Sequence, residues 1–162
     1  MQQSKTFWRY KLRPFKWDDL YAIQALTNVI AQHEQDPYLY SLEWLYFVLE
    51  QPNVNPERNC FVAILETDRI IGYSRIEASE DRSQVKVFAG THPDFEGAGI
   101  GRGLIAISDF NSLSIQSSNL PLTITRQSSS HNLNSANLLS RMGYTQTVTN
   151  ENNQQLWEKQ MR

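Results

Sequence analysis

The sequence predicts an α/β fold in which helices cover a mixed β-sheet. One observation behind this prediction is that two kinds of segment are interleaved: short runs of alternating or continuous apolar residues, typical of strands, and runs with apolar residues every three or four positions, typical of helices. The second is a stretch that joins a predicted strand to a predicted helix and holds four of the seven glycines, at alternate positions from 97 to 103. The predicted order is strand, two helices, three strands, helix, strand, helix and two strands.

The first 50 residues are expected to form one strand and two helices. Large side chains alternate over residues 7–15 (FWRYKLRPF), which predicts the first strand. A helix is expected to begin at Trp17 or Asp18, because apolar residues follow at helical spacing from residue 20 to residue 30. A second helix is predicted over residues 41–50 (SLEWLYFVLE); it begins near Ser41 and stops before Pro52.

The rest of the chain is expected to supply six strands and two helices. Residues 60–78 read as two strands around a turn at residues 67–68, and residues 83–91 as a third strand that runs into the glycines. A strand over 120–127 and a short helix over 135–144 follow, and residues 144–149 and 154–161 close the fold as a strand pair. Between them, a helix is predicted from Gly99, with the following residues on its buried face: Ile100, Leu104, Ile107 and Phe110.

The composition is that of a soluble globular protein with one domain over residues 1–162, since 40% of the residues are hydrophobic and 20% are charged. A net charge of −2 predicts neither nucleic acid nor a membrane as a partner. No signal peptide opens the chain, and the single cysteine rules out an internal disulfide, so a cytoplasmic protein is expected. That cysteine, Cys60, begins the apolar run CFVAIL and is interpreted as a core residue. Three histidines and one cysteine lack the spacing of metal ligands, so no metal is expected.

The glycine-rich turn has the pattern of an anion-binding site. Free N–H groups at the start of a helix point outward, and the helix dipole adds partial positive charge, so a phosphate or pyrophosphate suits this position. A P-loop is excluded because Arg102 and Gly103, rather than Lys and Ser or Thr, follow Gly101. A dinucleotide fingerprint matches locally, but the ribose-binding acid expected about twenty residues later would fall in a stretch without acids.

Three segments together resemble the GCN5-related N-acetyltransferase (GNAT) superfamily. Residues 91–104 (THPDFEGAGIGRGL) resemble its acetyl-CoA motif, in which a histidine–proline pair and an aromatic residue precede alternating glycines. Residues 132–144 (NLNSANLLSRMGY) resemble its later segment, which begins with asparagine and ends with glycine and an aromatic residue. Residues 13–26 (RPFKWDDLYAIQAL) resemble its opening. The predicted element order agrees along nearly the whole chain.

The resemblance implies a fold, a cosubstrate and a set of binding residues. The fold is a mixed, mostly antiparallel sheet of about seven strands that is split at the cofactor site and flanked by about four helices. The cosubstrate is acetyl-CoA, bound by the backbone at the end of the split strand, by the glycine loop and by an asparagine on the pantetheine arm. Carried over by position, these residues are Thr91, Glu96, Gly97, Ala98, Gly99, Ile100, Gly101, Arg102 and Asn132.

Two positions depart from the superfamily pattern, and the catalytic residues are unknown from sequence. Glu96 replaces the usual arginine or glutamine at the head of the pyrophosphate loop, where a carboxylate should weaken phosphate binding. Leu139 occupies the position of the tyrosine that often protonates the departing thiolate, and an alkyl group cannot do so. The strand before the glycines carries no carboxylate, which leaves His92 and Glu77 as weak candidates for a general base.

The charges are unevenly distributed along the chain. From residue 17 to residue 50 there are six acids and no Lys or Arg, and from residue 110 to residue 150 there is no acid. In the superfamily, the first two helices form one wall of the acceptor site, so a cationic acceptor is expected, with Glu34, Asp36 and Glu43 as its contacts. The opposite wall, expected to face the CoA phosphates, carries Arg102, Arg126 and Arg141. Solvated helix faces would look the same.

The resemblance implies an enzyme that transfers an acetyl group from acetyl-CoA to a primary amine, of a small molecule or a peptide, by direct attack in a ternary complex. The alternative is an acyl-CoA-binding or regulatory domain that kept the fold and lost the chemistry, as half of a tandem protein for example. Leu139 and the missing base favour the alternative, and the intact glycine row, which would be useless without CoA, does not exclude it. The oligomeric state is left open, a homodimer included.

Overall fold

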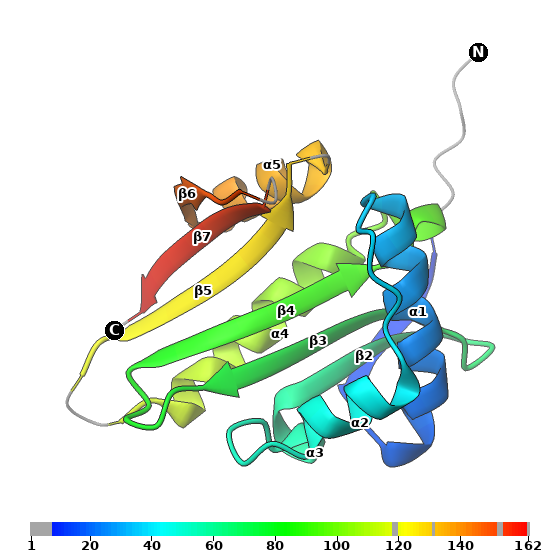
Figure 1. The fold of residues 1–162 in the computed structure, drawn as a ribbon, viewed down its shortest axis with the longest axis horizontal. Coiled ribbons are helices and arrows are strands. Elements are labelled where there is room, and N and C mark those ends of the chain that lie inside the picture. Colours follow the sequence, from blue (N-terminus) through cyan, green and yellow to red (C-terminus); the bar gives the residue numbers. More distant parts are fainter. Residues whose placement is uncertain (1–7, 118–119, 131, 152–153, 162) are drawn as a thin grey trace.

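A seven-stranded sheet forms the centre of the protein in the computed structural model, which describes residues 8–117, 120–130, 132–151 and 154–161 (Figure 1). Across the sheet the strand order is β1-β2-β3-β4-β5-β7-β6. Along the chain the strands are β1 (Tyr10–Pro14), β2 (Cys60–Leu65), β3 (Ile70–Ala78), β4 (Gln84–Thr91), β5 (Leu122–Ser129), β6 (Thr145–Thr149) and β7 (Gln154–Met161). Neighbouring strands are antiparallel except β4 and β5, which are parallel. The predicted mixed, mostly antiparallel sheet is therefore confirmed.

Helices cover both faces of this sheet (Figure 1). The two helices α1 (Leu20–His33) and α2 (Leu42–Leu49) lie on one face, and α4 (Ile100–Ile115) and α5 (Leu133–Arg141) lie on the other. These are the four predicted helices. The structure adds α3 (Pro56–Asn59) and two 3₁₀ turns, η1 (Trp17–Asp19) and η2 (Pro93–Phe95). With only four residues, α3 is too short to show an apolar period, which explains why the sequence did not predict it.

The helix after the glycines differs in orientation from the prediction. Phe110 was expected on its buried face and is 77% exposed, whereas Ser108 and Asp109 are buried. The spacing of apolar residues predicted the wrong buried face for this turn, because two polar side chains occupy its inward positions and the aromatic side chain does not. In the first predicted strand, residue 7 lies outside the described residues, and the strand itself begins at Tyr10.

Cys60 is a core residue, as predicted. It is fully buried in the cluster that α1 and α2 form with β2 and β3. Burial raises the pKa of its thiol to about 12, so the thiolate is not populated at neutral pH. This cysteine therefore contributes packing and not a nucleophile.

The strands β4 and β5 separate at their carboxyl ends. Their ladder runs only from the pair Gln84–Thr123 to the pair Val87–Arg126. Beyond it, β4 continues to Thr91 along β3, and β5 continues to residue 129 along β7. The two strands diverge in this way in Figure 1, and the sheet is split there as the resemblance implied.

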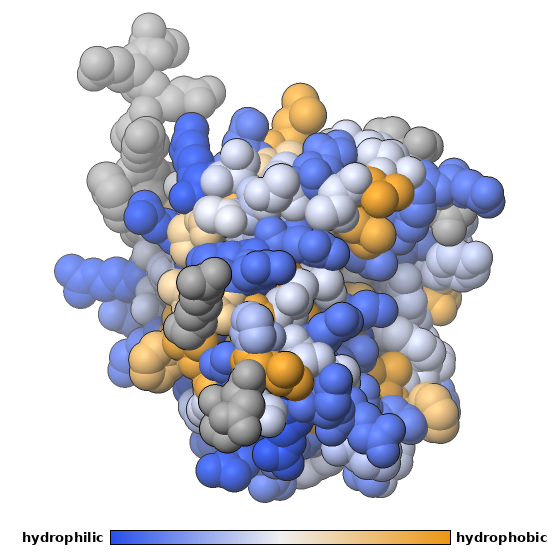
Figure 2. Space-filling model, turned by 90° about the vertical axis from the view of Figure 1, so that its left-hand side faces the viewer, coloured by the Kyte–Doolittle hydropathy of each residue, from blue (hydrophilic) through white to orange (hydrophobic). Residues whose placement is uncertain are grey.

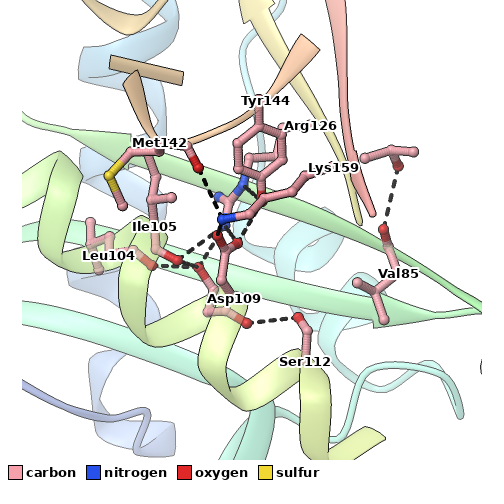
Figure 3. A network of polar contacts seen from close by, with 11 residues as sticks. Val85, Leu104, Ile105, Asp109, Ser112, Arg126, Met142, Tyr144 and Lys159 are labelled. Carbon is pink, nitrogen blue, oxygen red and sulfur yellow. Dashed lines mark hydrogen bonds and ion pairs between the residues drawn. The ribbon is translucent and has the colours of Figure 1, made fainter. Parts of the chain in front are cut away.

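A buried polar network joins α4 to β5 and β7, the strands on the far side of the split (Figure 3). Arg126 Nη2 of β5 donates to Asp109 Oδ1 of α4 at 2.9 Å and to Ser108 Oγ at 2.9 Å, and its Nε donates to the Tyr144 hydroxyl at 2.8 Å. The Tyr144 hydroxyl in turn donates to Asp109 Oδ1, and Lys159 Nζ of β7 donates to Asp109 Oδ2 at 3.1 Å. One carboxylate thus holds α4 against β5 and β7, and removing it would leave a buried guanidinium without its partner.

The surface shown in Figure 2 is mostly hydrophilic, with hydrophobic residues in small separate patches. Within the residues that the structure describes, no helix has both the length and the apolar character needed to cross a membrane.

Candidate functional site

A cavity of about 670 Å³ opens where β4 and β5 separate. Its walls come from the end of β4, the loop from η2 to α4, the first turns of α4, the middle of β5, the length of α5 and the C-terminal end of α1. The inner part is apolar, with Val87, Leu104, Ile105 and Leu139 among its residues. A cleft of this size and character suits an organic ligand with both an apolar and a charged portion.

The glycine loop forms one wall of the cavity and caps α4. Gly97 and Gly99 have left-handed backbone angles, with φ of +80° and +85°, and Gly99 is the N-cap of the 16-residue helix α4. Other residues adopt this conformation only with strain, so the glycines allow the chain to turn directly into the helix. A Cβ atom at either position would meet nothing within 4 Å, so the approach to the helix N-terminus is open.

Gly101 marks the narrow part of the cleft between α4 and α5. A Cβ atom placed there would lie 3.1 Å from Leu138 Cδ2 and 3.7 Å from Thr91 Oγ1. Any side chain at this position would therefore press on α5 and occupy the space in front of the first helical turn. The free N–H groups and the dipole of α4 give this space the electrostatic character that an anionic group requires.

Most of the predicted cofactor residues come together around the cavity. Those that line it are Thr91, Glu96, Gly97, Gly99, Gly101, Arg102 and Asn132. The other two, Ala98 and Ile100, face the core: Ile100 is 1% exposed and Ala98 packs against its cluster. The individual binding roles of these nine residues stay predictions.

The three predicted acceptor acids lie in different environments. Glu34 lines the cavity, and its Oε1 accepts a hydrogen bond from Asn132 Nδ2 at 3.2 Å. Asp36 accepts hydrogen bonds from the Tyr40 hydroxyl at 2.8 Å and from the Tyr38 backbone N–H at 3.0 Å, which orders the turn after α1. Glu43 is exposed on the first turn of α2 and does not line the cavity. Of the three, only Glu34 faces the site.

The environment of Glu34 alters its acidity. Burial raises the pKa of this carboxyl, and the hydrogen bond from Asn132 opposes part of that effect by stabilising the charged form. The neighbouring carboxylates Glu96 and Asp36 raise the pKa further, and His33 lowers it. Together these effects raise the pKa of Glu34, so it binds a proton more readily than an exposed glutamate.

The two weak base candidates from the sequence have other contacts. His92 caps η2, because its Nδ1 accepts a hydrogen bond from the Asp94 backbone N–H at 3.1 Å. Glu77 Oε1 accepts from Arg75 Nε at 3.1 Å on β3. Neither side chain lines the cavity. Leu139 does line it and is 3% exposed, so the position of the missing tyrosine belongs to the site.

The sequence predicted that three arginines face the CoA phosphates, and for Arg126 this prediction is wrong. Arg102 and Arg141 line the cavity, and so does Arg126, but the Arg126 side chain is only 3% exposed and forms an ion pair with Asp109. Asp109 is the residue immediately before the acid-free stretch, which begins at residue 110. The hydrogen-bonding groups of Arg126 are therefore used within the network in Figure 3 and not for a ligand. Among the described residues, no group of three or more His, Cys, Asp or Glu side chains could hold a metal ion.

No protein-family model matches the chain, and no curated protein matches it in sequence. Solved structures do match it in three dimensions. A GCN5-related N-acetyltransferase from Sphaerobacter thermophilus superposes with a TM-score of 0.75 at 16% identity over 85% of this chain. The chain has the GNAT fold.

Two further structures with this fold were solved with acetyl-CoA. A putative acetyltransferase from Salmonella typhimurium has a TM-score of 0.69 and 21% identity, over 94% of this chain and 93% of that one. A GNAT superfamily phosphinothricin acetyltransferase from Sinorhizobium meliloti has a TM-score of 0.71 and 15% identity, over 94% and 88%. The chain spans only 44% of the Sphaerobacter thermophilus protein. At these identities the likeness establishes the GNAT fold, and the activity is argued from the site.

Proposed function

We propose that the protein is an acetyl-CoA-dependent N-acetyltransferase that acts on a primary amine. The observation that carries the proposal is the glycine-lined cleft where β4 and β5 separate, directly in front of the N-terminus of α4. Two structures of the same fold bind acetyl-CoA, and the chain carries that superfamily's glycine motif at this position.

The residues around the cavity suit the parts of acetyl-CoA. The N–H groups at the start of α4 would hold the pyrophosphate, and Arg102 would add positive charge beside it. Asn132, across the cleft, would meet the pantetheine arm. The apolar inner walls would exclude water around the thioester. Glu96 is exposed, so its carboxylate can turn to solvent while its backbone keeps its place in the loop.

Acetyl-CoA would supply an activated acyl group as a thioester. The exposed edge of β4 beyond Val87, where pairing with β5 ends, would offer backbone N–H groups to the thioester carbonyl. The amine would attack that carbonyl directly while both substrates are held together. No covalent enzyme intermediate is required, which agrees with the burial of Cys60, the one cysteine of the chain.

The proposed acceptor is a cationic amine, such as a polyamine, an aminoglycoside-like amine or a lysine side chain. Glu34 is the half-buried carboxylate at the α1 side of the cavity, and Asp36 lies on the turn that follows. The rings of Tyr40 and Trp44 lie beside this turn, tilted at 47° with their centroids 4.6 Å apart, and aromatic rings of this kind can contact an ammonium group. Exposed contacts of this kind contribute about 1 kcal/mol each.

A second candidate function is a non-catalytic acyl-CoA-binding or regulatory domain. Leu139 favours it, because this side chain lines the cavity where the superfamily often has its proton-donating tyrosine. Such a domain would bind acetyl-CoA and release no CoA with any amine.

A panel of cationic, neutral and anionic amines, assayed for CoA release at two ionic strengths, tests the proposed acceptor. We expect efficient turnover of the cationic amines and a Michaelis constant for them that rises with salt, since salt screens exposed charges. Efficient acetylation of neutral or anionic amines, with cationic amines ignored and no salt effect, would overturn the cationic acceptor.

A further inference from the structure

We propose that Glu34 accepts the proton that the amine must lose, and that Asn132 positions it for this role. This inference rests on the proposed function, because it names the general base of the same site. It assigns Glu34 a part in the chemistry beyond attracting a positively charged acceptor.

The position of Glu34 in the fold supports this role. It is the C-cap of α1 and lies where α1 reaches the open end of the split between β4 and β5. The cavity contains two carboxylates, Glu34 and Glu96. Glu96 is exposed at the head of the glycine loop, on the side assigned to the pyrophosphate, whereas Glu34 is half-buried. Glu34 is therefore the carboxylate that an amine entering along α1 would meet.

Asn132 fixes the direction of the Glu34 carboxylate through its own capping role. Its side-chain Oδ1 accepts a hydrogen bond from the Ser135 backbone N–H at 3.0 Å and thereby caps α5. Because the cap requires the amide oxygen, the amide nitrogen must face the other way, toward Glu34 Oε1 at 3.2 Å. The contact joins residues 98 positions apart and spans the cleft from α1 to α5.

The charges around Glu34 make it a suitable base. Among the residues that the structure describes, the groups that act on it are His33 on α1, Asp36 and Tyr40 between α1 and α2, Glu96 on the glycine loop and Asn132 on α5. Burial and the two carboxylates favour the protonated form, so the pKa of Glu34 lies above that of an exposed glutamate. A base whose pKa lies closer to the working pH removes a proton more effectively in the transition state.

The proton balance is as follows. The acceptor enters as an ammonium ion and gives one proton to the Glu34 carboxylate. Its nitrogen lone pair then forms the C–N bond as the C–S bond breaks and its electron pair leaves with the sulfur. A second nitrogen proton passes through solvent to the thiolate, since Leu139 has no proton to give. Glu34 returns its proton to solvent, so the products are the amide, the thiol and one proton.

Two substitutions test the proposal in the full-length chain. Glu34→Gln keeps the hydrogen bond from Asn132 but cannot accept a proton, so kcat/KM for the amine should fall at least about a hundredfold while acetyl-CoA affinity is unchanged. The matched control is Glu80→Gln, which removes an exposed carboxylate in the turn between β3 and β4, outside the cavity residues. We expect the control to retain wild-type kinetics. Activity of Glu34→Gln within threefold of wild type would overturn the proposal.

The substitution Asn132→Ser tests whether Asn132 positions Glu34 for catalysis or only stabilises the fold. Serine preserves the cap of α5 but removes the amide that stabilises the ionised Glu34. The pKa of Glu34 should rise, and the ascending limb of the pH–rate profile should move to higher pH. A lower rate with an unmoved limb would show that Asn132 acts through folding, packing or cosubstrate binding and not through the acidity of Glu34, which would overturn its positioning role.

A side-chain ¹³C NMR titration of Glu34 in wild type and in Asn132→Ser provides a readout that needs no turnover. We expect a titration above the ordinary range for glutamate and a further rise in the variant. If wild type acetylates no amine, the proposed function fails. If wild type is active but Glu34 titrates at or below the ordinary value, only the role of Glu34 fails.

Discussion

Replacing Gly101 with valine is expected to weaken acetyl-CoA binding by about a hundredfold or more. In the structure, the first added carbon would already lie 3.1 Å from Leu138 Cδ2, and the two valine methyl groups would extend into the space before the first turn of α4. Loss of one or two hydrogen bonds from helix N–H groups to a charged ligand costs about 1.5–3 kcal/mol each. Since about 1.4 kcal/mol corresponds to a tenfold change in Kd, a loss near 3 kcal/mol gives the expected factor.

The substitution should also affect stability, so affinity must be measured on folded protein. Overpacking against Leu138 costs about 1–3 kcal/mol, which the better helix propensity of valine offsets only in part. Isothermal titration calorimetry with acetyl-CoA, after circular dichroism confirms folding, gives the result directly. Ala106→Val is the matched control, because it places a valine side chain at an exposed position of α4. An acetyl-CoA affinity within threefold of wild type in folded Gly101→Val would refute the reasoning.

Further outcomes are expected at three positions. Leu139→Ala should lower the free energy of unfolding by about 2–5 kcal/mol and leave turnover per folded molecule nearly intact. Leu139→Tyr should raise kcat, because tyrosine supplies a proton donor. A hundredfold fall in kcat of folded Leu139→Ala would contradict this expectation. Asp109→Asn should cost about 3–5 kcal/mol in urea unfolding, because it leaves the buried Arg126 guanidinium without a counter-charge, and a loss under about 1 kcal/mol would show that the network is not stabilising. Burial alone would raise the pKa of Asp19, but hydrogen bonds from Arg13 and a backbone N–H outweigh it and lower that pKa. The stability from Asp19 should thus be complete above about pH 4 and decline as the pH falls through the lowered value; if Asp19→Asn loses stability equally at all pH values, the ion pair is not its source.

The elements of the fold were predictable because their signals are local. Apolar periodicity marked the four long helices and seven strands, and the glycine row marked the turn into α4. The errors arose where tertiary contacts override that pattern. Ser108 and Asp109 face inward and turn Phe110 out to solvent, because Arg126 supplies their partner from β5.

The site was predictable on its cofactor side and not on its acceptor side. The glycine loop is one continuous segment, so its motif could be read directly from the sequence. The contact between Glu34 and Asn132 joins the end of α1 to the start of α5, and nothing in the sequence pairs two residues at that separation. The same holds for Asp36, whose turn contacts distinguish it from Glu34 only once the chain is folded.

The central claim, acetyl transfer from acetyl-CoA to an amine, is tested most directly by CoA release from the wild-type protein. The protein is incubated with acetyl-CoA and each amine of the panel, and the thiol is measured against a blank without amine. We expect amine-dependent thiol release that saturates with both substrates and is greatest for cationic amines. Release no faster than the blank for every amine, at acetyl-CoA concentrations shown to saturate binding, would contradict the account.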